Sequence, residues 1–192
     1  VRFADASLRG IGQVFFCNSP VSGVLFLIAV ATASVPTASM MLLGVCSATL
    51  FAQVLRLDAG LGPREGHGRR RFGVLTDTGT ITPWIVEQYA DLDALFLEAN
   101  YDPHMLSVGP YPAFLKARVG GDLGHLSNQQ AAGFVRIAGG RERLQHIAVA
   151  HISEKNNRPE LALAAMQEAL TGWSGNLLMA HQNQGLPWQT IE

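Results

Sequence analysis

Four ionisable residues in the second part of the chain have the types needed for metal binding or acid–base catalysis. Asp77, Glu98 and His151 each come directly after a short apolar run, and His125 lies in a Gly-His-Leu-Ser-Asn segment. Carboxylate oxygens and imidazole nitrogens bind divalent metals, and an imidazole oriented by a carboxylate can transfer a proton. A single polar residue at the end of a strand is as often a turn former, so the residues are of interest as a set.

The apolar runs predict strands, and helical stretches separate them. Ser127 followed by Gln130 is a capping box that starts one helix, and Pro83 and Pro159 suit the first turns of two others. Alternation of strands and helices predicts an α/β fold, in which the strand ends form one edge where ligands bind. The chemistry-bearing residues should therefore converge there. The expected strands are 72–76, 94–97, 146–150 and 177–180, and the expected helices are 83–89, 127–138 and 160–170.

The first 60 residues differ from the rest in charge. They hold five charged groups and no His, whereas residues 61–192 hold the other 24 charged groups and all six His. Between Arg9 and Arg56, 46 residues carry no charge at all. A membrane-spanning helix needs about 20 apolar residues, so two short spans fit, with a break at Pro36. We therefore predict that residues 21–55 form an apolar helical hairpin that contacts a membrane. The same composition also suits helices buried in a soluble protein.

A Gly- and Arg-rich segment joins the two parts. Residues 59–71 read AGLGPREGHGRRR and predict a linker between a first unit, 1–58, and a second, 72–192. The triple Arg could bind anionic lipid or open a strand. The net charge of -1 gives no overall sign of a nucleic-acid binder. Cys17 and Cys46 lack CxxC spacing, which argues against a disulfide framework or a zinc site in the first part.

The first part resembles a known transporter family. Residues 5–23 are similar to the repeat opening of bacterial urea transporters, roughly LRGxGQVxFxNNPxxG before a membrane helix, and the similarity reaches residue 58. In that family the residue matching Gln13 lies close to the urea pathway, so the resemblance implies a substrate-binding amide; the alternative is a helix cap or a surface amide. The family's channel needs two inverted repeats of several helices, and only the opening of one is present.

The second part resembles the C-terminal half of metallo-β-lactamase-fold hydrolases, of the sort related to phosphodiesterases and nucleases. The resemblance implies half of an αββα sandwich, a divalent metal such as Zn²⁺ or Mn²⁺, and a phosphodiester or nucleic-acid substrate. It implies that Asp77 bridges two metals and that His151 binds the second. It also implies that Glu98 and His125 form an acid/His pair that assists proton transfer to the leaving group. The matching motifs are TDTG at 76–79, LEANYD at 97–102, GPYP at 109–112, GHLSN at 124–128 and AHISEKNNRPELA at 150–162.

One departure from that family shapes the interpretation. The family's HxHxDH motif supplies most of the metal ligands, and it does not occur in this sequence. Asp77 and His151 alone would bind metal weakly, because a catalytic zinc normally keeps three protein ligands. We interpret the chain as a chimeric or truncated hydrolase, inactive unless another chain supplies the missing half, with its second part cytoplasmic and its first in the inner membrane. The alternatives are a fragment of a urea transporter and a fusion product without function.

Overall fold

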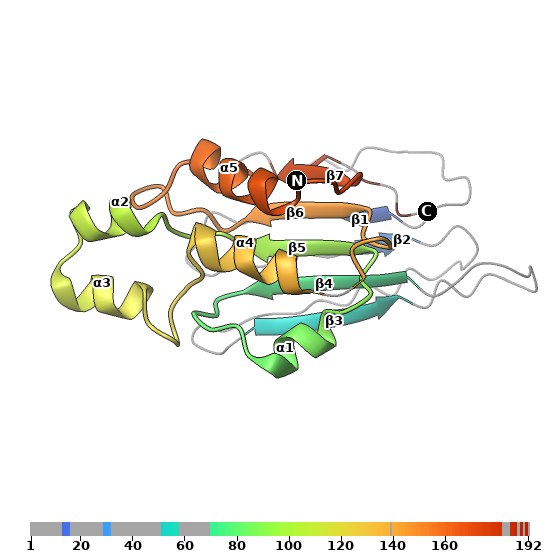
Figure 1. Ribbon diagram of the computed structural model, residues 1–192, viewed down its shortest axis with the longest axis horizontal. Helices are drawn as coiled ribbons and strands as arrows, with labels where there is room; N and C mark the ends of the chain where they lie inside the picture. Colours follow the sequence, from blue (N-terminus) through green and yellow to red (C-terminus); the bar gives the residue numbers. More distant parts are fainter. Residues whose placement is uncertain are drawn as a thin grey trace, which may run out of the picture.

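The computed structural model describes residues 13–15, 29–31, 51–57, 70–138, 140–181, 185–187, 189 and 191, with side chains described from Arg71 onward. Figure 1 shows strands stacked side by side with helices against them. The elements in chain order are β1 (Gln13–Phe15), β2 (Ala29–Ala31), β3 (Phe51–Leu57), β4 (Arg70–Thr76), α1 (Pro83–Gln88), β5 (Ala94–Glu98), α2 (Pro103–Val108), α3 (Ala113–Val119), α4 (Asn128–Ile137), β6 (His146–Ala150), α5 (Pro159–Ala169) and β7 (Asn176–Met179).

The main sheet has five strands in the order β3-β4-β5-β6-β7. Strands β4 to β7 run parallel, and β3 joins the edge of β4 antiparallel to it. Each parallel neighbour is reached through a helical connection, as parallel pairing requires. The predicted α/β fold is confirmed, and its four predicted strands agree with β4 to β7 to within two residues at each end.

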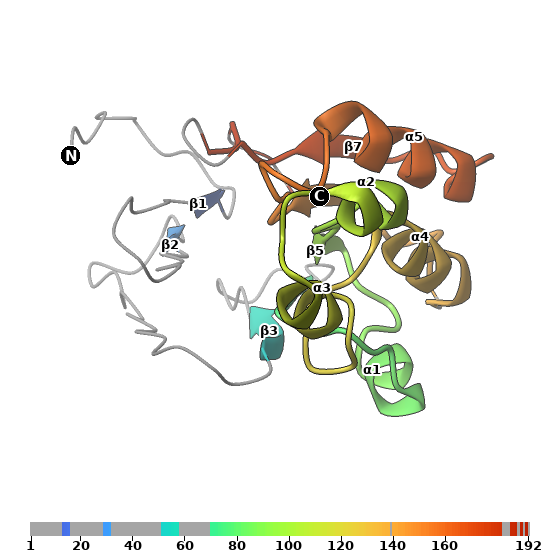
Figure 2. The same cartoon turned by 90° about the vertical axis from the view of Figure 1, so that its left-hand side faces the viewer.

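Helices α1, α4 and α5 cover one face of the sheet (Figure 2). Leu97 and Val149 of the central strands are fully buried there against Phe134 of α4 and Met166 of α5. The sequences of β5 and β6 are almost continuously apolar because both faces of these strands are buried. The other face carries a second cluster of buried residues, among them Phe96, with partly buried residues packed against it. That cluster comprises Phe72, Ala94, Phe96, Ala148 and Ala150.

The predicted helical hairpin over residues 21–55 is wrong where the structure describes it. Residues 29–31 form β2, and residues 51–57 form β3, which pairs along the whole of β4. The physical reason is that β4 has an open edge, where an antiparallel strand can satisfy its backbone hydrogen bonds. The rest of the hairpin lies outside the described residues. Among those that the structure describes, no helix has the length and apolarity to cross a membrane.

Two short helices, α2 and α3, were not expected from the sequence. Asp102 caps α2, because its Oδ1 accepts a hydrogen bond of 2.9 Å from the Met105 amide, and Pro103 occupies the first turn. These helices lie past the carboxyl ends of the parallel strands, at the left of Figure 1. Helices α2 and α3 therefore flank the end of the sheet that was predicted to hold the site.

The predicted capping box at the start of α4 is confirmed. The Ser127 hydroxyl accepts a hydrogen bond of 3.2 Å from the Gln130 amide, and the Gln130 side chain accepts one of 2.9 Å from the Ser127 amide. Gln130 Nε2 also donates to the Gly79 carbonyl at 2.9 Å. The start of α4 is thus tied to the loop after β4, and His125 precedes the capping residue Ser127 by two residues.

Candidate metal and acid–base site

The three residues that follow or end the strands come together at one edge of the sheet. Asp77 follows β4, Glu98 ends β5 and His151 follows β6, and these strands are adjacent and parallel. The carboxyl ends of parallel neighbours share one edge, which is why residues far apart in sequence meet there. We call Asp77, Glu98 and His151 the strand-end set. The predicted convergence is confirmed.

Asp77 and His151 leave their strands in an unusual backbone conformation. Their φ angles are 55° and 53°, in the left-handed region that residues with a Cβ atom rarely adopt. This conformation costs roughly 1–2 kcal/mol per residue relative to the right-handed one. Surrounding structure must therefore hold both residues in place, a pattern found at functional sites.

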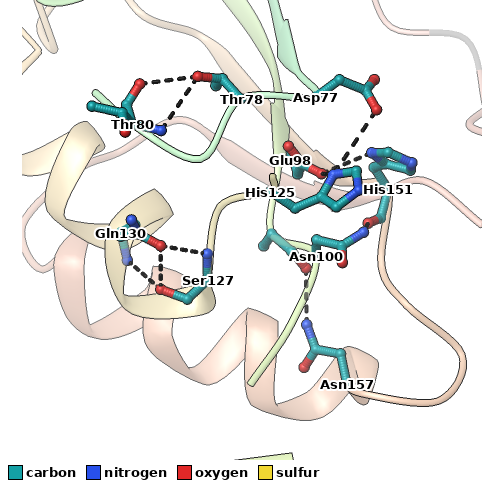
Figure 3. Close-up of polar contacts among 11 residues, drawn as sticks. Asp77, Thr78, Thr80, Glu98, Asn100, His125, Ser127, Gln130, His151 and Asn157 are labelled. Carbon is teal, nitrogen blue, oxygen red and sulfur yellow. Dashed lines mark hydrogen bonds and ion pairs between the residues drawn. The ribbon is translucent and has the colours of Figure 1, made fainter. Parts of the chain in front are cut away.

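His125 joins the strand-end set from the loop before α4. Ligand atoms of Asp77, His125 and His151 all lie within 4.8 Å of one another, as Figure 3 illustrates. Nδ1 of His125 is 3.9 Å from Oδ1 of Asp77. The two imidazole rings meet edge to face with centroids 5.1 Å apart. The side chains of Asp77, His125 and His151 are 41%, 27% and 25% exposed, so solvent and ions can reach them.

Glu98 lies beneath the two imidazoles and is fully buried. Its Oε1 is 2.6 Å from Nδ1 of His125, a hydrogen bond, and 2.8 Å from Nδ1 of His151. The second contact is at ion-pair distance without the alignment of a hydrogen bond. One buried carboxylate therefore orients both rings, the arrangement that commonly supports metal-binding histidines.

Burial and charge act in opposite directions on the protonation of this pair. Burial alone would raise the pKa of Glu98, but its contacts with His125 and His151 outweigh burial and hold that pKa below 4.5. Burial alone would lower the pKa of His151, but Glu98 and the charge of Asp77 raise it above 6.5. The carboxylate is kept ionised inside the protein, and the imidazole next to it is a stronger base.

The donor atoms fit a divalent transition metal. Asp77, His125 and His151 offer one carboxylate and two imidazoles, a donor set that suits Zn²⁺ and Mn²⁺. Three protein ligands with an open position is the pattern of catalytic zinc. The sequence assigned His125 only to the pair with Glu98, so its place beside the two other donors was missed. The available signal was its position just before a capped helix at the same edge of the sheet.

Gln13 is the residue that the urea-transporter resemblance places near a urea pathway. It is more than 60 residues before Asp77 in the sequence. It begins β1 and pairs with Ala31 of β2. Its side chain lies outside the described residues, so its role in a urea pathway stays a prediction.

The two parts of the chain are similar to unrelated proteins. The urea transporter family profile matches residues 4–61. A C-terminal region is 37% identical over 102 residues to "Exodeoxyribonuclease WalJ" of Streptococcus pneumoniae serotype 2, covering 53% of this chain and 37% of that protein. It is 32% identical over 104 residues to "Exodeoxyribonuclease YycJ" of Bacillus anthracis, covering 54% of this chain and 39% of that protein.

The resemblances stated from the sequence are thus both found. The chain spans less than two-fifths of the length of either curated relative. Among solved structures, the metallo-β-lactamase-fold protein YhfI from Bacillus subtilis aligns with a TM-score of 0.40 at 12% identity, covering 92% of this chain and 48% of that one.

Proposed function

We propose that residues 72–192 provide the C-terminal half of a metal-dependent phosphodiester hydrolase that acts on nucleic acid. The observation that carries the proposal is the grouping of Asp77, His125 and His151 above the buried carboxylate of Glu98. The names of the two sequence relatives, both exodeoxyribonucleases, support a nucleic-acid substrate. In this proposal the parallel sheet and its helices are half of an αββα sandwich.

The residues would divide the work as follows. Asp77 and His151 would hold the divalent metal, Zn²⁺ or Mn²⁺, with His125 close enough to join them. A bound divalent ion polarises the phosphoryl oxygen and lowers the pKa of its water ligand. Glu98 accepts the hydrogen bond from Nδ1 of His125, which fixes the ring and leaves Nε2 as its one free nitrogen. Where His125 joins the metal ligands, Nε2 would bind the metal; where it does not, Nε2 would give a proton to the leaving oxygen.

We propose further that this chain does not hydrolyse phosphodiesters by itself. The sequence has no HxHxDH motif, and the described residues bring three donors together where two-metal hydrolysis needs a clamp of two ions. The chain would then be a chimera of a urea-transporter-like fragment, 1–58, and half of a hydrolase. A second chain that carries the HxHxDH half would complete the site.

A second candidate function is that of a urea-transporter fragment, which the profile match over residues 4–61 favours. In that case residues 21–55 would contact a membrane, and Gln13 would lie near the urea pathway. Partition of the full chain into detergent, with Gln13 protected from solvent there, would support this candidate. A soluble monomer without detergent would count against it. If the chain is a fusion product without function, it should neither hydrolyse phosphodiesters with a complementing chain nor partition into detergent.

Hydrolysis assays test the main proposal. The full chain should give no metal-dependent hydrolysis of bis(p-nitrophenyl) phosphate or single-stranded DNA above background. Co-expression with the HxHxDH half of a relative should restore hydrolysis, and Asp77→Ala or His151→Ala in this chain should abolish it. Hydrolysis by the chain alone that Asp77→Ala removes would contradict the proposed inactivity. Restored activity that survives both substitutions would contradict the assigned roles.

A further inference from the structure

Asn100 lies in the segment after Glu98 and connects it to the loops of His125 and His151, although nothing in the proposed chemistry uses it. It lies two residues after Glu98, and only 8% of its surface is exposed. Its backbone amide donates to the Leu126 carbonyl at 2.9 Å, in the loop that carries His125. Its backbone carbonyl accepts a hydrogen bond of 2.9 Å from the Ser153 amide, in the loop that follows β6.

The Asn100 side chain makes the contact that only certain residue types could make. Its Nδ2 donates to the backbone carbonyl of His151 at 2.8 Å (Figure 3). The backbone bonds of Asn100 would survive most substitutions, but this one requires a short side chain with an N–H or O–H donor. Ala removes the donor altogether and leaves the His151 carbonyl without this partner.

His151 needs such a support because of its conformation. Its φ of 53° is unfavourable for a residue with a Cβ atom, so the chain adopts it only when neighbouring contacts over-determine it. The contact with Asn100 fixes the direction of the His151 carbonyl, and hence the peptide plane that follows the ring. Because the Asn100 backbone also holds the His125 loop, one residue sets both imidazoles relative to Glu98.

We infer that Asn100 is a positioning residue whose side chain holds His151 in the left-handed conformation and so keeps the His151 ring over Glu98, while its backbone holds the loop of His125. The inference about metal affinity rests on the proposed function; the inference about His151 geometry does not. Asn100 touches neither substrate nor metal in this account, and it acts through the backbone of His151.

A second buried asparagine provides a matched control. Asn128 is 1% exposed, and its Nδ2 donates at 2.9 Å to Oδ1 of Asn157, whose Nδ2 donates back at 2.8 Å. Asn128→Ala therefore removes a buried carboxamide and its hydrogen bonds, as Asn100→Ala does. The hydrogen bonds of the Asn128 side chain do not reach His125 or His151. A general loss of stability should therefore appear in both variants, whereas a loss of His151 positioning should appear only in Asn100→Ala.

The first experiment measures Mn²⁺ binding to the full chain by electron paramagnetic resonance, with Mn²⁺ alone as the probe. Asn100→Ala should weaken binding about 10- to 100-fold, the usual effect of removing a group that orients a metal ligand. Asn128→Ala should keep the wild-type affinity. Unchanged affinity in Asn100→Ala, or an equal loss in both variants, would overturn the role in metal affinity.

The second experiment uses chelator-treated protein and so does not depend on metal. The ¹³Cα and ¹³Cβ chemical shifts of His151 should show the left-handed conformation in the wild type and in Asn128→Ala, and lose it in Asn100→Ala. Left-handed shifts that persist in Asn100→Ala would overturn the inference. If the wild type binds no Mn²⁺, the proposed function fails while this measurement still decides the positioning role.

A third measurement on the wild type covers the case in which Asn100→Ala does not fold. The Asn100 side-chain amide protons should exchange with solvent slowly, because one of them is held by the His151 carbonyl. Exchange at the rate of a solvent-exposed carboxamide would overturn the inference.

Discussion

Oε1 of Glu98 lies 2.6 Å from Nδ1 of His125, a hydrogen bond between a fully buried carboxylate and an imidazole that is 27% exposed. The same oxygen lies 2.8 Å from Nδ1 of His151. A single buried charge thus contacts both rings and raises the pKa of His151. The sequence resemblance implied the pair with His125, and the contact with His151 is added by the fold.

Replacing Glu98 with Gln should lower the pKa of His151. The carboxylate raises that pKa against the effect of burial, so burial dominates once the charge is gone. Loss of the two charge-assisted contacts should also cost about 1–3 kcal/mol of unfolding free energy. An NMR titration of His151 in chelator-treated protein measures the first effect, and urea unfolding measures the second. A His151 titration that is identical in the variant would contradict the assigned cause.

The free energy of unfolding of the metal-free protein should be highest between about pH 4.5 and 6.5. The folded-state pKa of Glu98 is lowered, so its contribution is present above its ordinary value of 4.5 and is lost as pH falls through the folded value. The folded-state pKa of His151 is raised, so its contribution is present below its ordinary value of 6.5 and is lost as pH rises through the folded value.

Urea unfolding over a pH series, with chelator present, measures this dependence. Glu98→Gln should flatten it on both sides, because both contributions depend on the Glu98 carboxylate. A stability profile whose shape does not change in Glu98→Gln would show that other groups are responsible.

Arg143→Leu should destabilise the protein without affecting the candidate site. Oδ1 and Oδ2 of the buried Asp93 accept hydrogen bonds of 2.9 and 3.0 Å from Arg143, whose side chain is 41% exposed. Asp93 precedes β5, at the end of the strand opposite Glu98. Because solvent screens the exposed guanidinium, the expected loss is about 1–3 kcal/mol rather than the full cost of breaking a buried pair.

Chemical unfolding of Arg143→Leu checks that loss, and Mn²⁺ binding should stay at the wild-type level. A wild-type midpoint for unfolding, or a weaker affinity for Mn²⁺, would contradict the assignment of Asp93 and Arg143 to stability alone.

Local signals account for the parts of the fold that could be predicted. The capping box at Ser127 satisfies backbone groups within four residues, and apolar runs bounded by Gly, Pro and Asp need no partner to be recognised. The edge that gathers Asp77, Glu98 and His151 follows from parallel topology alone. These features depend on short-range chemistry or on one rule of chain geometry.

Of the missed features, β3 and the approach of His125 to Asp77 depend on contacts that the sequence pattern does not contain, whereas α2 does not. Apolar runs without a clear period fit a buried helix or a strand equally, and Phe51–Leu57 forms a strand because β4 offers it an edge. Helix α2 was signalled by Asp102-Pro103, a cap and a first-turn proline that were available to read. The position of His125 just before a capped helix indicates this edge of the sheet, but its approach to Asp77 depends on how the loop before α4 packs.

Metal binding by the full chain tests the central claim most directly. Isothermal titration with Zn²⁺ or Mn²⁺ should show binding that falls at least about 10-fold in Asp77→Ala, in His125→Ala and in His151→Ala, because each removes one of three donors. His104→Ala, which removes an exposed imidazole on α2 outside that group, should leave the affinity unchanged. A wild-type chain that binds neither metal, or a loss in His104→Ala equal to the loss in the three site variants, would contradict the account.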